Sequence, residues 1–181
     1  MSHALRLRNL LWAGLCVLCW AGGLAHATNP VEEPDLKAAY IFNFIQFIEW
    51  PDSDLATDGD WPLCISPFSP LKRALTALEG KPARKGRPIR VRLLELAELR
   101  HCRVLILHGS DIEPVLRALR ALPPAHGILT VADEDAAGSP DIMITLSQQK
   151  NRIVFAINTD ATARAGLSVS SRLLRLARAA R

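Results

Sequence analysis

Cysteines are the residues of this sequence whose number and spacing point most directly to chemistry. Two of the four, Cys16 and Cys19, lie in an apolar leader and are expected to be removed with it. The remaining two, Cys64 and Cys102, form an even pair, which in an exported protein indicates a structural disulfide. The alternative is a reactive thiol at Cys102, for which the adjacent His101 would be the activating base.

Common catalytic and metal-binding patterns do not occur in this sequence. The histidines outside the leader, His101, His108 and His126, lack the spacing of two metal ligands on one helix. The stretch 166–170 begins like the nucleophile elbow of a hydrolase, but Ser170 stands where that motif needs a glycine. We therefore expect no catalytic residue, no metal site and no cofactor.

An acidic cluster is one candidate for ligand binding. Asp133, Glu134 and Asp135 follow a predicted strand, and open α/β sheets often bind ligands at the carboxyl ends of their strands. A small-molecule crevice near Ser66, Gly109 and Asp133 is therefore one hypothesis. The alternative is a solvated loop without a ligand.

Arginines recur at every third position at the end of the chain, opposite a row of apolar residues. The arginines are Arg172, Arg175, Arg178 and Arg181, and the apolar residues are Leu173, Leu176 and Ala177. On one helix they would form either a solvated face, favoured by the helix dipole, or a surface for an acidic partner or anionic lipid headgroups.

The first 27 residues are typical of a secretory signal peptide. Arg6 and Arg8 precede an apolar stretch at 10–24, and Ala-His-Ala at 25–27 is a small-x-small cleavage site. A retained membrane anchor is the alternative. The net charge of +4 falls by two when Arg6 and Arg8 are removed, which is too little to suggest a nucleic-acid partner. We expect residues 28–181 to form one exported domain.

An aromatic-rich segment opens the predicted domain. Leu36–Trp50 lies between Pro34 and Pro51, which bracket a helix, and it is apolar nearly all round. Its aromatic residues are Tyr40, Phe42, Phe44, Phe47 and Trp50. They are expected to be either core residues or the anchors of a protein interface.

Strands and helices alternate through the rest of the chain. Strands are predicted at 61–68, 88–94, 102–107, 127–132, 142–146 and 153–157, and helices at 70–79, 111–122 (with Ser110 as its cap), 159–165 and 170–180. This alternation predicts a single α/β domain with a mostly parallel central sheet, helices on both faces and a C-terminal antiparallel hairpin.

Several stretches resemble the YfiR family of periplasmic proteins, in the expected order and over nearly the whole mature chain. They are residues 36–44, 47–51, 78–81, 86–89, 101–106, 128–133, 154–158 and 165–174. Cys64 and Cys102 match the usual disulfide positions of that family. A second cysteine pair found in some members does not occur in this sequence.

The resemblance implies a periplasmic repressor and not an enzyme. Such proteins hold the periplasmic sensor domain of an inner-membrane diguanylate cyclase inactive, which lowers cyclic-di-GMP and biofilm formation, and an outer-membrane lipoprotein relieves the repression. The candidate contact residues are Tyr40, Phe44, Phe47, Trp50, Asn158, Ser170, Ser171, Arg172 and Arg175. A small-molecule-binding sensor and an accessory subunit of a histidine kinase are the alternatives, and a homodimer is left open.

Overall fold

The computed structural model of the chain describes residues 32–51, 59–133, 139–150 and 152–179. Val31–Arg181 belong to one compact unit. The predicted signal peptide, the side chain of Asp133, and Glu134, Asp135 and Arg181 lie outside the described part of the chain.

A seven-stranded sheet runs through the domain in the order β3-β2-β4-β5-β6-β7-β9. Its strands are β2 (Trp61–Ile65), β3 (Ile89–Leu93), β4 (Val104–Leu107), β5 (Leu129–Asp133), β6 (Ile144–Gln149), β7 (Arg152–Ile157) and β9 (Arg178–Ala179). The strands from β3 to β6 pair in parallel, and β7 turns back against β6 as an antiparallel hairpin. This confirms the predicted α/β fold with its C-terminal hairpin.

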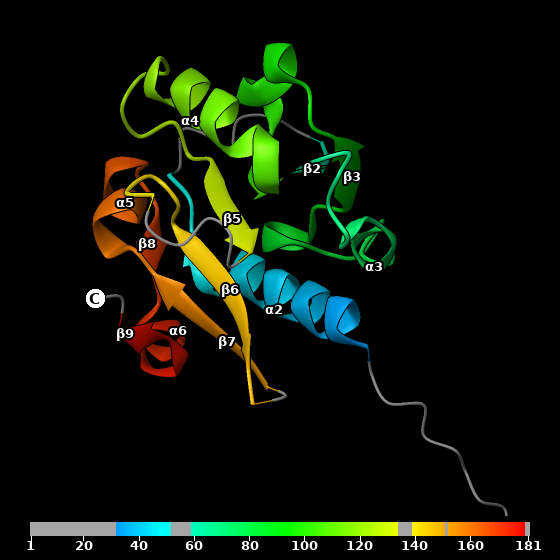
Figure 1. Cartoon of the computed structure of the whole chain (residues 1–181). Coiled ribbons are helices and arrows are strands. Elements are labelled where there is room, and N and C mark those ends of the chain that lie inside the picture. Colours follow the sequence, from blue (N-terminus) through cyan, green and yellow to red (C-terminus); the bar gives the residue numbers. More distant parts are fainter. Residues whose placement is uncertain (1–31, 52–58, 134–138, 151, 180–181) are drawn as a thin grey trace, which may run out of the picture. The chain divides into compact units, whose positions relative to one another are not determined.

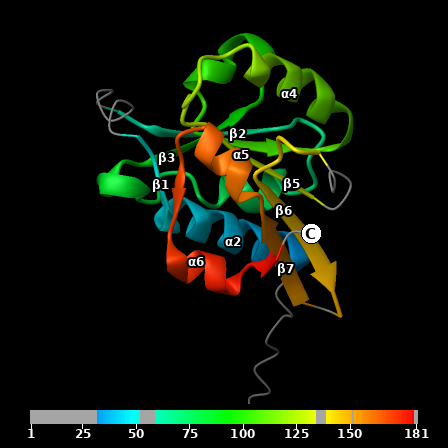
Figure 2. The same ribbon diagram turned by 90° about the vertical axis from the view of Figure 1, so that its left-hand side faces the viewer.

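Helices cover both faces of this sheet, as predicted. They are α2 (Glu33–Phe47), α3 (Lys72–Thr76), α4 (Ile112–Arg120), α5 (Thr159–Arg164) and α6 (Ser171–Leu176), with short 3-10 turns η2 (Arg84–Gly86), η3 (Leu96–His101) and η4 (Gly109–Asp111). Figures 1 and 2 show α4 on one side of the strands and α2 on the other, with α6 beside α2.

The domain has two hydrophobic cores, one on each face of the sheet, and β4 contributes side chains to both. Successive side chains of a strand point to opposite faces. Val104 and Ile106 belong to the core cluster that includes α2, whereas Leu105 and Leu107 belong to the cluster that includes α4. All four residues are buried. A strand that is apolar on both faces thus joins the two cores.

The helix predicted at Leu36–Trp50 differs at both ends. It begins at Glu33, with Pro34 in its first turn, where the missing N–H of proline is tolerated. It ends at Phe47 because Ile48–Glu49 (β1) leave the helix to pair antiparallel with Ser168–Val169 (β8). The prediction that the helix continues to Trp50 was therefore wrong.

The prediction of one terminal helix over residues 170–180 was also wrong. The helix α6 ends at Leu176, and Arg178–Ala179 form β9, which pairs in parallel with the end of β7. Arg172 and Arg175 remain on the helix, so the predicted four-arginine helical stripe does not exist. Leu176, predicted on the apolar face, is 69% exposed, because the chain leaves the helix immediately after it.

Smaller differences concern the limits of other elements. The strand predicted to reach residue 68 ends at Ile65. The helix predicted over 70–79 is shorter and spans only Lys72–Thr76. Ser110 lies within η4, and the N-cap of α4 is Asp111, which makes no side-chain capping hydrogen bond. Among the described residues, no helix is both long and apolar enough to cross a membrane.

Candidate functional site

The end of α2 and the beginning of α6 form one surface, which we call the α2–α6 surface. The N–H of Ser170 donates to the carbonyl oxygen of Phe47 at 3.1 Å, next to the β1–β8 pairing. The guanidinium of Arg172 lies over the Phe47 ring, 5.5 Å from its centroid. The structure thus brings together three of the predicted contact residues from distant parts of the sequence.

Most of α6 faces solvent. The hydroxyl of Ser170 accepts from the N–H of Leu173 at 3.2 Å and caps the helix, while the Leu173 side chain packs into the core. Ser171, Arg172, Leu174, Arg175 and Leu176 are all exposed. This helix therefore presents two arginines and two leucines, a combination that suits a partner surface with acidic and apolar groups.

The predicted aromatic contacts divide between the surface and the core. Phe47 and Tyr40 are half-buried, and the Tyr40 ring packs against Phe155 at 5.7 Å between centroids. Phe44 is fully buried, and Trp50 is 8% exposed, packed edge-on against another tryptophan at 4.9 Å. Phe44 and Trp50 are therefore core residues in this structure and do not lie on the α2–α6 surface.

Asn158 lies apart from the α2–α6 surface. Its side-chain oxygen accepts from the N–H of Ala161 at 3.0 Å, which caps α5. Its amide nitrogen donates to the carbonyl oxygen of Pro140 at 3.0 Å. These contacts give Asn158 a structural role at the start of α5.

Cys64 and Cys102 form a disulfide in the structure, with Cα atoms 5.8 Å apart. Both cysteines are almost fully buried between the sheet and α4. The ring of His101 is exposed and contacts the carboxylate of Glu98. Both sulfur atoms are bonded in the disulfide, so the structure has the predicted disulfide and no free thiol at Cys102.

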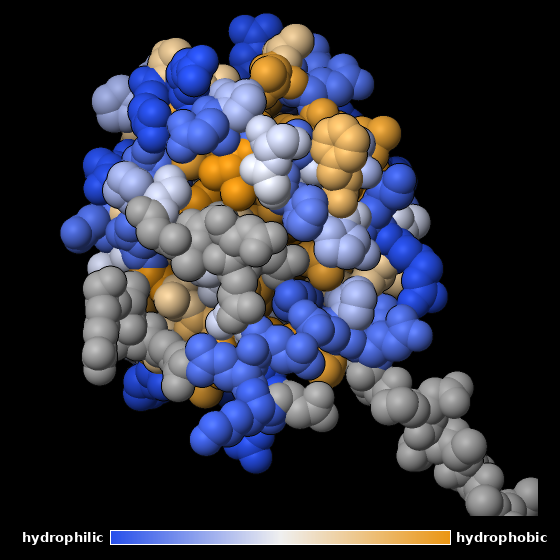
Figure 3. Space-filling view, in the orientation of Figure 1, coloured by the Kyte–Doolittle hydropathy of each residue, from blue (hydrophilic) through white to orange (hydrophobic). Residues whose placement is uncertain are grey.

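A cavity of about 510 Å³ lies between α4 and α5, which we call the α4–α5 cavity. Its lining residues are Leu116, Leu119, Arg120, Leu122, Pro123, Pro124, His126, Asp141, Met143, Ala161, Arg164 and Ala165. In the orientation of Figure 1, Figure 3 shows orange hydrophobic atoms exposed among blue side chains below α4.

This cavity is not the crevice that the sequence suggested. The lining residues His126, Asp141 and Met143 precede β5 and β6, whereas the predicted crevice near Ser66, Gly109 and Asp133 lies where strands end. Ser66 is fully buried, and its hydroxyl accepts from a backbone N–H two residues later. The crevice near Asp133 stays a prediction.

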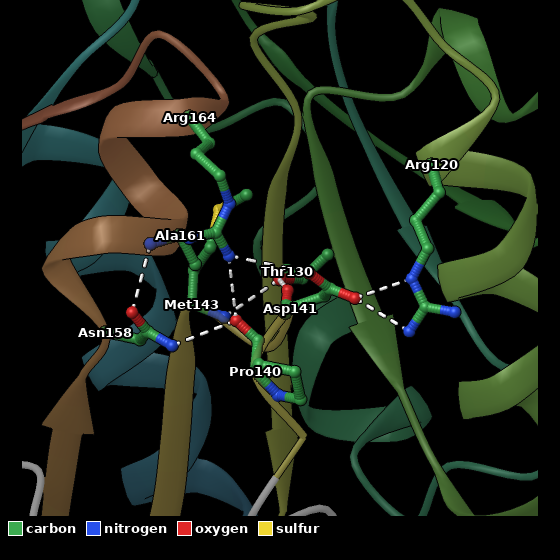
Figure 4. A network of polar contacts seen from close by, with 8 residues as sticks. All are labelled: Arg120, Thr130, Pro140, Asp141, Met143, Asn158, Ala161 and Arg164. Carbon is green, nitrogen blue, oxygen red and sulfur yellow. Dashed lines mark hydrogen bonds and ion pairs between the residues drawn. The ribbon is translucent and has the colours of Figure 1, made fainter.

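Figure 4 shows a polar network that includes Arg120, Asp141 and Arg164, three of the residues that line the α4–α5 cavity. Asp141 accepts from Arg120 at 2.7 Å and lies 3.5 Å from the guanidinium of Arg164. The same guanidinium donates to the carbonyl oxygen of Pro140 at 3.1 Å. Below them, buried Thr130 donates to the carbonyl oxygen of Asp141 at 3.0 Å. A single carboxylate therefore holds two cationic side chains at the rim.

Sequence reasoning missed this network. Asp141 is 21 residues from Arg120 and 23 from Arg164. The three come from α4, α5 and the segment before β6, and only the packing of the helices around the sheet brings them together. No short-range spacing could have signalled the group. In the part of the chain that the structure describes, no group of three or more side chains is placed to hold a metal ion.

Comparison with known proteins gives one family match. A family model described as YfiR/HmsC-like matches residues 34–178, which includes every element described above except the first residue of α2 and the last residue of β9. No curated protein matches the chain.

Proposed function

Because this chain belongs to the YfiR/HmsC-like family, we propose that it is a periplasmic regulatory protein that represses an inner-membrane diguanylate cyclase. In this proposal it binds the periplasmic sensor domain of the cyclase and thereby lowers cyclic-di-GMP and biofilm formation. The protein acts by binding and has no catalytic step of its own.

The exposure of α6 is the observation that carries this proposal at the level of residues. Leu174 and Leu176 are 39% and 69% exposed, and Arg172 and Arg175 of the same helix are exposed as well. Arginine and large apolar residues are enriched where protein interfaces bury surface. We therefore propose that α6, together with Phe47 and Tyr40 of α2, contacts the sensor domain.

Repression by binding requires a difference in affinity for two states of the partner. A protein that binds the inactive state of the sensor more tightly by about 3 kcal/mol shifts the equilibrium on the order of a hundredfold. An outer-membrane lipoprotein that competes for the same surface would relieve repression. A second copy of the chain bound to this surface would also compete with the sensor domain and relieve repression.

Cellular cyclic-di-GMP, measured with the gene deleted and then restored, tests the proposal. We expect cyclic-di-GMP to rise on deletion and to return to its earlier level with the wild-type gene. Restoration with L174D should fail, because a carboxylate placed among the contacts opposes association with an acidic and apolar surface. Crosslinking of the tagged protein should capture a membrane cyclase.

The matched control is L96D. Leu96 is 52% exposed and lies just after β3, at the opposite edge of the sheet from β9. The L96D protein should restore repression, and immunoblots should show equal amounts of both variants. Unchanged cyclic-di-GMP on deletion would rule out the cyclase and move the proposal to a histidine kinase partner.

A further inference from the structure

We propose that the α4–α5 cavity is a binding site for a small carboxylic acid with an apolar body. This site is separate from the α2–α6 surface, and the proposal does not depend on the regulation of a cyclase. Its volume of about 510 Å³ falls in the range of about 300–1,000 Å³ that small-molecule sites occupy.

The interior of the cavity is apolar. Leu116 and Leu119 are buried and line it from α4, and buried Met143 lines it from the position just before β6. Ala161 of α5 and Ala165, the C-cap of α5, line the other side. These residues offer no charged group to a ligand. An apolar body placed against them is removed from water, which is the main favourable term for such a ligand.

The wall between the two helices is held by backbone hydrogen bonds. In the loop after α4, the N–H of Ala125 donates to the carbonyl oxygen of Arg164 at 3.1 Å, and the N–H of Gly127 donates to that of Ala165 at 2.9 Å. These hydrogen bonds fix the loop against the end of α5, and a wall that is already fixed reduces the entropy cost of binding.

The rim of the cavity determines the charge of the ligand. Arg120 and Arg164 contribute two positive charges against the one negative charge of Asp141. Asp141 occupies only part of each guanidinium, since Arg120 uses Nε and Nη2 and Arg164 uses Nη2. The planar guanidinium group matches a carboxylate with two parallel hydrogen bonds, so the remaining N–H groups suit an anion.

The ion pairs at the rim lie in solvent and add little to the stability of the domain. The side chains of Arg120 and Arg164 are 52% and 58% exposed, and ion pairs in such positions typically add about 0–1 kcal/mol. The same contacts do hold both guanidinium groups beside an apolar cavity. That placement is what recognition of an apolar acid requires.

The test uses 2-naphthoate as the probe and 2-naphthalenemethanol as its neutral counterpart, with the mature protein. Calorimetry should show saturable binding of 2-naphthoate. The R120Q and R164Q variants should each bind it about tenfold more weakly, because each removes a charge-assisted hydrogen bond. Their affinity for the alcohol should stay unchanged. The control R117Q, on an exposed part of α4 outside the cavity, should bind like the wild type.

A variant of Asp141 distinguishes a binding role of the network from a purely structural role. The D141N variant should bind 2-naphthoate more tightly than the wild type, since both guanidinium groups lose their anionic competitor. A network with only a structural role predicts weaker binding or none. Circular dichroism would confirm that each variant is folded.

One measurement needs no variant. In two-dimensional amide NMR of the wild type, 2-naphthoate should shift the signals of Gly127, Met143 and Ala161–Ala165 and leave those of Ser171–Leu176 in place. The proposal is overturned if 2-naphthoate does not saturate, if it shifts other regions instead, or if R117Q weakens binding as much as R120Q.

Discussion

At the scale of single residues, the disulfide joins Cys64 of β2 to Cys102, which follows η3, and closes a loop with a sequence separation of 38. A crosslink of this span stabilises by restricting the unfolded chain, by about 4 kcal/mol in the chain-entropy estimate. The double variant C64S/C102S should therefore lose about that much free energy of unfolding, measured by urea denaturation. Dithiothreitol should lower the wild-type stability similarly and leave the double variant unchanged. Equal stability of variant and wild type would contradict the role of the disulfide.

Gly166 is a second residue on which the fold depends. It has a φ of +76°, and a Cβ built there would lie 2.8 Å from the Cβ of Ala125, in the loop that forms the cavity wall. The G166A variant should therefore unfold at lower urea concentrations. The strain of a left-handed alanine costs about 1 kcal/mol, and the clash adds about 1–3 kcal/mol.

Gly80 provides a matched control for this prediction. Its φ of +73° is nearly the same, but a Cβ there would meet nothing within 4 Å. The G80A variant should show only the backbone strain. If G80A and G166A lose equal stability, the close approach of α5 to the loop after α4 does not matter.

At the scale of elements, the outer strand β3 has an edge that must be protected from association. The carboxylate of Glu79 accepts from the N–H of Val91 at 2.7 Å on that edge and pairs with Arg90 at 2.9 Å. The hydrogen bond from Val91, followed by that from Arg90, lowers the pKa of Glu79 from its ordinary value of 4.5. A side chain thus takes the place of a neighbouring strand.

This lowered pKa makes the stability of the domain depend on pH. A carboxylate with a lower pKa in the folded state stabilises fully above its unfolded pKa, and the contribution is lost as pH falls through the folded value. Unfolding in urea from about pH 6 to about pH 3 should therefore show a stability advantage of wild type over E79Q that shrinks with acid. The control E113Q, at an exposed position of α4, should change in parallel with the wild type.

At the scale of the whole molecule, the two cores share one sheet, so neither is expected to survive without the other. β4 contributes Val104 and Ile106 to one core and Leu105 and Leu107 to the other. A protein of residues 28–181 should therefore unfold in one transition, with tryptophan fluorescence and far-ultraviolet circular dichroism changing together. Trp50 and Trp61, the two tryptophans among the described residues, both lie in the core that includes α2. Their fluorescence therefore reports the unfolding of that core. A fluorescence change at lower urea than the dichroism change would show that this side unfolds separately.

Local patterns in the sequence were sufficient for the class of fold. The alternation of apolar strands with helices, the buried run at β4 and the polar turn before β7 depend on near neighbours, and they predicted the parallel sheet and its hairpin correctly. The even pair of cysteines likewise predicted the disulfide. Residue types close together along the chain carry this information because burial on one or both faces sets their period.

Only the tertiary structure decided where helices stop and which distant side chains meet. Residues 48–49 and 178–179 left their predicted helices because strands β8 and β7 offered partners for their backbone groups. Phe44 and Trp50 became core because the sheet covers them, while Arg172 reached Phe47 across the β1–β8 pairing. Arg120, Asp141 and Arg164 met because α4 and α5 pack at the same end of the sheet. Such contacts depend on packing between distant segments, which no local period encodes.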